Sequence, residues 1–320
     1  MTLATEGDGR NLLHRSVLLE EAVEWLLTRR DGTYVDCTLG AGGHSEAILQ
    51  RLDENGRLIG MDQDEEALRI AEERLAPYAG RTTLVKANFR HLGAVFDNLG
   101  VHQVDGFLLD LGISSMQVDT RERGFSYHHD ERLDMRMDRK QELSAWDVVN
   151  RWSEEQIRDV LFRYGEERFA PQIARAIVRR RLQESIDTTG ELAEIVKGAI
   201  PAAARRSGPH PARRTFQAIR IAVNDELGAL QEGLVQTLER LRSGGRIVVI
   251  TFHSLEDRIC KQQFAEWAKG CVCPPSFPVC ACHRRPRIRL VTRRPILPSE
   301  EEVRENPRAR SAKLRVAEKC

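Results

Sequence analysis

The amino-acid sequence predicts an α/β fold in which a parallel sheet is interrupted by a block of helices. In the first third of the 320 residues, short apolar runs alternate with amphipathic helical segments, which is typical of a parallel sheet. No convincing strand pattern follows between residues 117 and 215, and then the apolar run 245–252 resembles a core strand. We therefore expect a sheet domain in two parts, 1–116 and 216–320, with an inserted helical domain at 117–215.

Each expected element rests on its local pattern. Apolar side chains recur at helical spacing in residues 17–27, and the helical segment 64–75 has an acidic first turn, which suits a helix N-terminus. Further helices are expected at 155–162, 171–183, 192–200 and 216–241. Strands are expected at 34–37, 57–61, 82–86, 104–109, 245–252 and 313–317.

A glycine-rich turn after the first expected strand is the most informative feature. The turn at 40–45 (GAGGHS) leads into a helical segment, so the backbone can approach a ligand closely at a helix N-terminus. The next apolar run ends at Asp62, where a carboxylate can hold the hydroxyls of a ribose. Together these features predict a nucleoside-bearing cofactor, and the alternative is a tight structural turn.

Details of the same turn indicate which cofactor binds. Counting from Gly40, the dinucleotide fingerprint requires a third glycine at position 45, which is Ser45. Asp36, at the entrance of the turn, would repel a pyrophosphate but suits the ammonium group of an amino acid. These two residues favour S-adenosylmethionine, which has no phosphate, over a nicotinamide dinucleotide.

Two later segments carry candidate chemistry. Asp110 ends the fourth expected strand, at the sheet edge where ligands bind, and could accept a hydrogen bond from a substrate amine or the cofactor. The alternative is a turn or helix-capping carboxylate. The segments 121–127 and 133–138 combine arginines with aromatic residues, which neutralise phosphates and stack on bases, but they suit an irregular packed loop equally well.

The net charge of +1 hides an uneven distribution of charges. Residues 195–224 and 267–299 contain arginines and lysines but no acid, which indicates a polyanion site, the alternative being a solvated face. No apolar run approaches the length of a membrane span, and the polar first ten residues do not resemble a signal peptide. We expect a cytoplasmic protein.

Four of the seven cysteines lie close together in the sequence. Disulfides are not expected in a protein without a secretory signal. The pattern Cys271, Cys273, Cys280 and Cys282 could close a tetrahedral zinc site, although the pairs are spaced C-x-C rather than the commoner C-x-x-C. The alternative is a loop of free thiols.

A series of motifs along the chain resembles one family, ribosomal RNA small subunit methyltransferase H. The resemblance runs from residue 14 to residue 317. The motifs are DCTLGAGGHS (36–45), LDLGISS (109–115), RGFS (123–126), LDMRMD (133–138), YGEERFA (164–170), RTFQAIR (214–220), FHSLEDR (252–258) and NPRARS (306–311).

The resemblance implies a Rossmann-like, class I S-adenosylmethionine-dependent methyltransferase sheet. It also implies methylation of the N4 amine of a cytidine in the decoding region of 16S rRNA, within the small ribosomal subunit. Met116 stands where the family usually has proline. The paired C-x-C segment is not needed for the family's activity, so the cysteine pattern remains a local feature. By resemblance the cofactor contacts are Gly42, Gly43, His44, Asp62, Phe89, Asp110 and Gln117.

Asp110 is also the expected catalytic residue. Cytosine N4 is a poor nucleophile because its lone pair is delocalised into the ring. An acceptor placed against its N–H bonds, either Asp110 or a backbone carbonyl in residues 111–115, would favour attack on the methyl group. The alternatives are a methyltransferase that acts on another RNA, DNA or protein amine, and a cofactor sensor without chemistry. DNA amino-methyltransferases usually carry Asn/Asp-Pro-Pro-Tyr/Phe after the fourth strand, whereas this chain has DLGI at 110–113.

Overall fold

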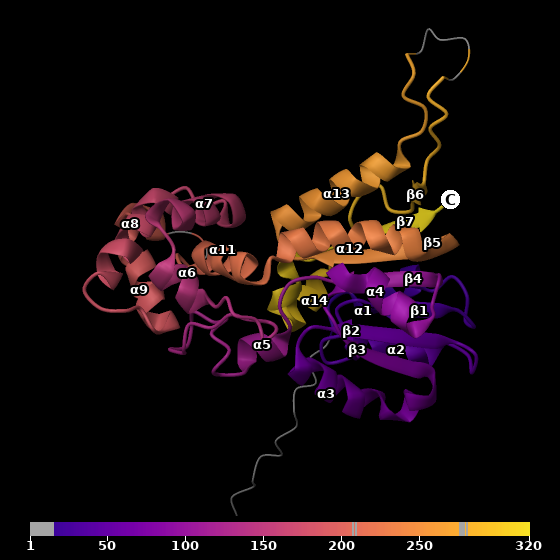
Figure 1. The fold of residues 1–320 in the computed structure, drawn as a ribbon, viewed down its shortest axis with the longest axis horizontal. Helices are drawn as coiled ribbons and strands as arrows, with labels where there is room; N and C mark the ends of the chain where they lie inside the picture. Colours follow the sequence, from indigo (N-terminus) through magenta and orange to yellow (C-terminus); the bar gives the residue numbers. More distant parts are fainter. Residues whose placement is uncertain (1–15, 207, 209, 275–278, 280) are drawn as a thin grey trace, which may run out of the picture.

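Seven strands form the sheet that organises the larger part of the molecule (Figure 1). The computed structural model describes residues 16–206, 208, 210–274, 279 and 281–320. The strands are β1 Thr33–Asp36, β2 Arg57–Asp62, β3 Thr82–Lys86, β4 Val104–Asp110, β5 Leu241–Thr251, β6 Ile288–Leu290 and β7 Lys313–Lys319. Their order across the sheet is β3-β2-β1-β4-β5-β7-β6.

The carboxyl ends of the parallel strands meet at one edge of this sheet. β1 pairs in parallel with both β2 and β4, and β4 pairs in parallel with β5, whereas β7 runs antiparallel to β5 and β6. The strand order reverses between β1 and β4, which is the place where open α/β sheets bind ligands. The arrangement confirms the expected Rossmann-like class I sheet.

Helices cover both faces of the sheet. On one face α1, α2 and α3 pack against Tyr34 and Leu108. On the other face α4, α12 and α13 pack against Val35 and Phe107. Neighbouring strand residues therefore point into opposite cores, as the two-residue period of a strand requires. These helices are α1 Leu19–Leu26, α2 Gly43–Arg51, α3 Glu65–Leu75, α4 Leu92–Leu99, α12 Glu226–Arg240 and α13 Ser254–Ala268.

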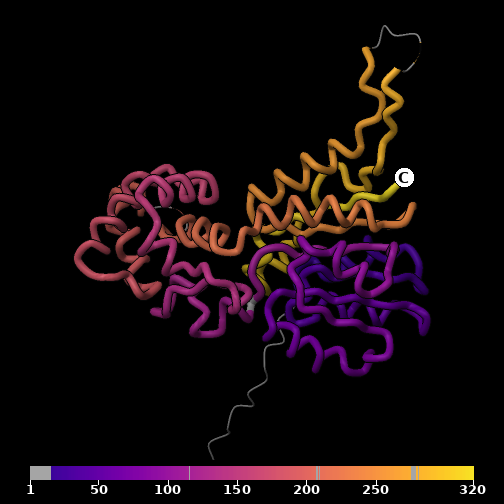
Figure 2. The backbone as a smooth tube through the Cα atoms, viewed as in Figure 1, coloured from indigo at the N-terminus to yellow at the C-terminus, as the bar shows by residue number. Residues whose placement is uncertain are grey.

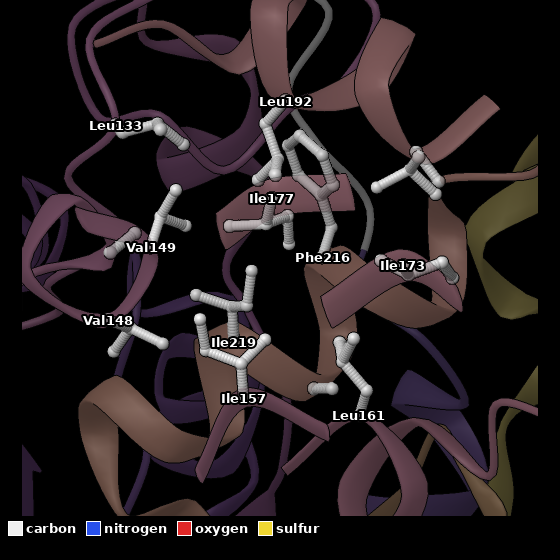
Figure 3. Close-up of a cluster of buried hydrophobic side chains, with 14 of the residues drawn as sticks. Leu133, Val148, Val149, Ile157, Leu161, Ile173, Ile177, Leu192, Phe216 and Ile219 are labelled. Atoms are coloured by element: carbon white, nitrogen blue, oxygen red, sulfur yellow. The ribbon is translucent and has the colours of Figure 1, made fainter. Parts of the chain in front are cut away.

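The chain between β4 and α12 forms a helical lobe with a core of its own (Figures 1 and 3). Its helices are α5 Ser115–Asp119, α6 Ala145–Arg151, α7 Glu154–Gly165, α8 Ala170–Arg181, α9 Thr189–Ala199, α10 Ala202–Arg205 and α11 Arg213–Asn224. Ile157, Ile177 and Phe216 converge in this core. The boundary expected between residues 215 and 216 falls inside α11, whose Phe216 and Ile219 belong to the lobe's core.

The expected single helix at 216–241 is wrong, because the chain forms α11 and α12 instead. The helices meet at Asp225, whose φ of +46° is left-handed. Aspartate tolerates this conformation better than most residues because its short side chain can hydrogen-bond locally. Each helix has an apolar face, one buried in the lobe and one on the sheet. Apolar residues therefore recur at helical spacing on both sides of Asp225, and the sequence pattern gives no sign of the break.

The other expected elements are confirmed to within a few residues at each end. The sequence reasoning missed α4, α6 and α13, the short helices α5, α10 and α14 (Glu300–Glu305), and β6, which is only three residues long. Between α13 and β6 the chain makes an excursion, whose described residues 269–274, 279 and 281–287 extend away from the sheet (Figure 2). Within the described residues no helix is long and apolar enough to cross a membrane.

Candidate active site

A cleft of about 760 Å³ opens at the carboxyl ends of β1, β2 and β4. One side is formed by the loops that follow these strands, and the other by α11 and the segment 125–128 of the helical lobe. The structure brings most of the predicted site residues together there. Those that line the cleft are Gly43, His44, Asp62, Phe89, Asp110 and Gln117. Gly42 does not line it and packs against Ala71 of α3 instead.

The glycine turn and Asp62 hold each other in place. Gly40 and Gly42 adopt positive φ angles of +51° and +80°, which glycine permits without strain. The amide of Gly40 donates to Oδ2 of Asp62 at 2.8 Å, and the amide of Asp64 donates to Oδ1 at 2.8 Å. Burial raises the pKa of Asp62 to about 6, although these two amides act against the rise. The carboxylate is thus fixed at the cleft with one further acceptor site on each oxygen.

Asp36 does not have the role that the sequence suggested. Its Oδ2 accepts a hydrogen bond from Ser45 Oγ at 2.7 Å, and its Oδ1 accepts one from the amide of Thr38. The side chain is buried and does not line the cleft. The expectation that Asp36 contacts an ammonium group is therefore wrong. Its carboxylate stabilises the glycine turn from behind.

Asp110 and His44 form a second pair within the cleft. Nδ1 of His44 lies 3.6 Å from Oδ2 of Asp110, and Nε2 lies 3.1 Å from the carbonyl oxygen of Val17. Burial raises the pKa of Asp110 well above its usual value, and the nearby Asp36 and Glu256 carboxylates raise it further. Oδ1 of Asp110 is buried and has no hydrogen-bond partner among the residues that the structure describes. Such an atom is a candidate contact for a ligand.

Gln117 has its side-chain amide engaged at both ends. Its Oε1 accepts from the amide of Ser114 at 3.1 Å, and its Nε2 donates to Oδ2 of Asp64 at 2.9 Å. The same Asp64 oxygen accepts from Nη2 of Arg123 at 2.7 Å, and both of these charged side chains are 3% exposed. Gln117 therefore reaches the cleft as part of a buried network that joins the lobe to α3.

The same network decides between the two interpretations of an arginine-rich segment. Arg123 belongs to the segment 121–127, which suited phosphate binding and an irregular packed loop equally well. Its guanidinium is instead buried against Asp64 and the carbonyl oxygens of Arg136 and Met137. Arg136 is likewise paired with Asp134 through two bonds of 2.8 Å. These two arginines stabilise the loop and are not available to a phosphate.

Phe89 lines the cleft and depends on a glycine of α12 for its position. A Cβ atom added to Gly233 would lie 2.4 Å from Cδ2 of the Phe89 ring, so only glycine allows this approach. Phe89 follows β3, as Asp62 ends β2, and both side chains reach the same cleft. An aromatic ring and a ribose-binding carboxylate are thus available to one nucleoside.

The cleft also contains charged or titratable residues that were not among the predicted site residues, and one group of them lies close together: Arg220, Glu226, His253 and Glu256. Arg220 makes two bonds of 2.8 Å to Glu226. Oε2 of Glu256 accepts from the amides of Phe252 and His253, and Oε1 lies 3.1 Å from His253 Nε2. Arg220, His253 and Glu256 lie in the motifs at 214–220 and 252–258, whereas Glu226 lies in none of the motifs.

This group of residues does not suit a metal ion. Glu226, His253 and Glu256 are close enough to share one. However, both Glu226 oxygens are held by Arg220, whose positive charge would repel a cation. Burial alone would raise the pKa of Glu256, but the bonds from His253 and Phe252 and the charge of Arg220 outweigh it and lower that pKa. Glu256 is thus an ionised carboxylate satisfied by the protein itself.

Aromatic rings form the lobe's side of the cleft. Tyr127 stacks on His210 with 4.6 Å between ring centroids and an interplanar angle of 10°, and it meets Phe216 edge to face at 5.5 Å. Burial and the neighbouring His128 and Lys197 lower the pKa of His210, which favours its neutral form. Tyr127 and Phe216 both line the cleft. The lobe therefore presents flat, uncharged rings to it.

Comparison with known proteins identifies the relatives of this chain. The MraW methylase family matches residues 11–320. The chain is 59% identical over 306 residues to a ribosomal RNA small subunit methyltransferase H of Brevibacillus brevis, covering 96% of this chain and 98% of that protein. It is 60% identical over 306 residues to the protein of the same name from Symbiobacterium thermophilum, covering 96% of each.

Proposed function

Because this chain belongs to the MraW methylase family, we propose that it transfers a methyl group from S-adenosylmethionine to the N4 amine of a cytidine in the decoding region of 16S rRNA. Relatives named ribosomal RNA small subunit methyltransferase H support an rRNA substrate. The observation that carries the proposal is the two-sided cleft. Its sheet side offers a fixed carboxylate and an aromatic ring to a nucleoside, and its lobe side offers stacked aromatic rings.

The sheet side fits S-adenosylmethionine. Asp62 keeps one acceptor site on each oxygen for ribose hydroxyls, and Phe89 offers a ring face to adenine. A Cβ atom at Gly43 would lie 2.3 Å from Ser16 Oγ, so a larger residue there would require the Ser16 hydroxyl group to move away. We therefore assign the cofactor site to Gly42, Gly43, His44, Asp62, Phe89, Asp110 and Gln117. Of these, Gly42 contributes to the cofactor site by shaping the glycine turn, and Gln117 contributes by fixing the position of α5.

The lobe side fits a base that has left its stack. Bases stack on aromatic side chains irrespective of sequence, and a base undergoing chemistry must leave the helix. Tyr127 offers such a ring and is braced from behind by His210. We propose that the inserted helices, expected at 117–215 and extended here by the rest of α11, form the rRNA-binding domain. The two core parts then carry the cofactor.

Asp110 is the proposed acceptor for the proton of the amine. Its Oδ1 has no partner within the described part of the chain, and its side chain lines the cleft and is 24% exposed, so an incoming N–H group can approach the carboxyl group. The cofactor, when bound, supplies a methyl group on a positively charged sulfur. That charge favours the ionised form of Asp110, and the raised pKa of Asp110 makes it a stronger base than an ordinary carboxylate.

The test is methylation of small ribosomal subunits taken from cells that lack this activity. The reaction uses isotopically labelled S-adenosylmethionine, followed by nucleoside digestion and mass spectrometry. Label in N4-methylcytidine is the expected result, and Asp110→Asn should abolish it. The surface variant Arg69→Ala, which removes an exposed ion pair with Glu73, is the matched control.

Two outcomes would change the proposal in different ways. Label in another nucleoside, in DNA or in protein would keep the cofactor but overturn the cytidine substrate. No label in any acceptor, with cofactor binding intact by calorimetry, would favour a cofactor sensor. Normal turnover by Asp110→Asn would remove Asp110 from the reaction.

A further inference from the structure

The excursion between α13 and β6 carries the cysteine pattern and has almost no core. Among its described residues, 269–274, 279 and 281–287, none is buried, and Val272 and Val279 are 58% and 76% exposed. Its base is tied to the sheet domain where Arg287 donates its amide to the carbonyl oxygen of Trp267 at 2.8 Å. A segment that cannot bury apolar surface commonly depends on a metal or a covalent link for its structure.

We propose that Cys271, Cys273 and Cys282 bind one zinc ion through their thiolates. Their Sγ atoms all lie within 4.8 Å of one another. A Zn–S bond of about 2.3 Å in tetrahedral geometry spaces two sulfurs by about 3.8 Å. Cys271 Sγ and Cys282 Sγ are 3.7 Å apart, which matches that spacing and is much longer than a disulfide bond of about 2.05 Å.

Backbone amides point at these sulfurs as they do at metal-bound thiolates. The amides of Ala281 and Cys282 both lie 3.3 Å from Cys273 Sγ. The amides of Cys273 and Val272 approach Cys271 Sγ at 3.4 Å and Cys282 Sγ at 3.5 Å. Hydrogen bonds to the ligand atoms orient them and stabilise their negative charge. Each of the three sulfurs receives at least one such amide.

The surroundings of the site also suit a structural ion. Arg284 binds the carbonyl oxygen and the carboxylate of Glu266 in α13, so the arm after Cys282 is anchored to that helix. Cys280, the fourth cysteine of the sequence pattern, lies outside the described residues. Soft thiolates select zinc over magnesium or calcium, which prefer oxygen ligands. The site lies on the excursion and shares no residue with the methyl-transfer cleft.

The test measures metal in the full-length protein, purified in reducing buffer without a chelator or a metal-affinity step. Elemental analysis should find about one zinc per chain. The triple variant C271S/C273S/C282S should hold less than about a tenth of that amount, whereas Cys320→Ser, which removes an exposed thiol outside the cluster, should keep it. Cobalt(II) added to metal-free protein should give a sulfur-to-metal charge-transfer band, and zinc should abolish the band.

Three results would overturn the proposal. The first is wild-type protein that stays free of zinc after incubation with the ion and buffer exchange, with all three thiols open to a thiol reagent. The second is unchanged zinc in the triple variant, which would place the ion outside the three cysteines. The third is a cobalt spectrum without a thiolate band. Circular dichroism of the triple variant would show whether the sheet domain remains folded. A loss of zinc from a folded variant can then be attributed to the missing thiolates.

Discussion

Nδ1 of His44 faces Oδ2 of Asp110 across 3.6 Å, and the two groups form a neutral pair rather than an ion pair. The carbonyl oxygen of Val17 can only accept, so Nε2 of His44 carries the imidazole proton and Nδ1 keeps its lone pair. Burial lowers the pKa of His44 to about 4 and raises that of Asp110. The protonated carboxyl group of Asp110 therefore faces the lone pair of His44 Nδ1. The ligand-free cleft thus contains two neutral groups instead of two buried charges.

Asp110→Asn should stabilise the ligand-free protein while abolishing turnover. A carboxyl whose pKa is raised by folding favours the folded state at low pH, and that contribution is lost as pH rises through the raised pKa. We expect a higher melting temperature for the variant at pH 8, a smaller difference at pH 5, and a kcat at least about 100-fold lower. Calorimetric melts across this pH range check the first part, and a variant less stable than wild type at pH 8 would contradict it.

Arg123→Met should destabilise the fold strongly, because it leaves the buried Asp64 carboxylate without its cation. Breaking a buried ion pair from one side costs about 3–5 kcal/mol. Urea unfolding of the variant measures this loss. Arg69→Ala removes an exposed pair with Glu73 and should change the free energy of unfolding by less than about 1 kcal/mol. Equal effects of the two substitutions would show that the buried network contributes nothing special.

Gly233→Ala should weaken cofactor binding without touching the cofactor. The added methyl group would overlap the Phe89 ring, so the ring must move at the cleft wall. We expect roughly tenfold weaker binding of S-adenosylmethionine, or about 1.4 kcal/mol, by calorimetry. The control is Gly198→Ala in α9, where an added Cβ atom would meet no other atom within 4 Å. Because alanine favours a helix more than glycine does, this substitution should stabilise the protein by about 0.5–1 kcal/mol. Unchanged affinity in Gly233→Ala would separate Phe89 from the cofactor site.

Tyr127→Ala should impair the rRNA substrate and spare the cofactor. Loss of one stacked base costs about 1–3 kcal/mol, which should appear as a higher KM for small subunits. The affinity for S-adenosylmethionine should stay the same, because Tyr127 belongs to the lobe's side of the cleft. Tyr127→Phe keeps the ring and should restore KM. A Phe variant as impaired as the Ala variant would point to the hydroxyl group instead of stacking.

The parts of the site that could be predicted are those encoded within a few residues. The glycine turn and Asp62 were found because a strand end, a turn and a helix start follow one another directly in the sequence. Asp110 was found for the same reason, as the last residue of an apolar strand. The expected resemblance to ribosomal RNA small subunit methyltransferase H is confirmed by the relatives of that name and by the family match.

The parts that failed depend on side-chain partners and packing that the local sequence pattern does not record. Asp36 is turned away from the cleft because Ser45, in the first turn of α2, donates a hydrogen bond to one of its carboxylate oxygens. Whether Arg123 faces RNA or packs within a loop was left open by the sequence, because its partner Asp64 lies 59 residues earlier. The break at Asp225 separates α11, which packs in the core of the lobe, from α12, which packs on the sheet. The spacing of apolar residues is the same in both helices, so it does not show that they pack in different cores.

The position of β7 gives the growing polypeptide an aggregation hazard. β7 begins 62 residues after β5 ends (313 − 251), yet it fills the place between β5 and β6. Until it is made, the apolar segment 247–250 of β5 has an unpaired edge, and β6 lacks its partner within the described sheet. At about 5–20 residues per second, translation leaves that edge open for roughly 3–12 seconds. During this interval the nascent chain is exposed to edge-to-edge association with other chains, and a chaperone that covers β5 would protect it.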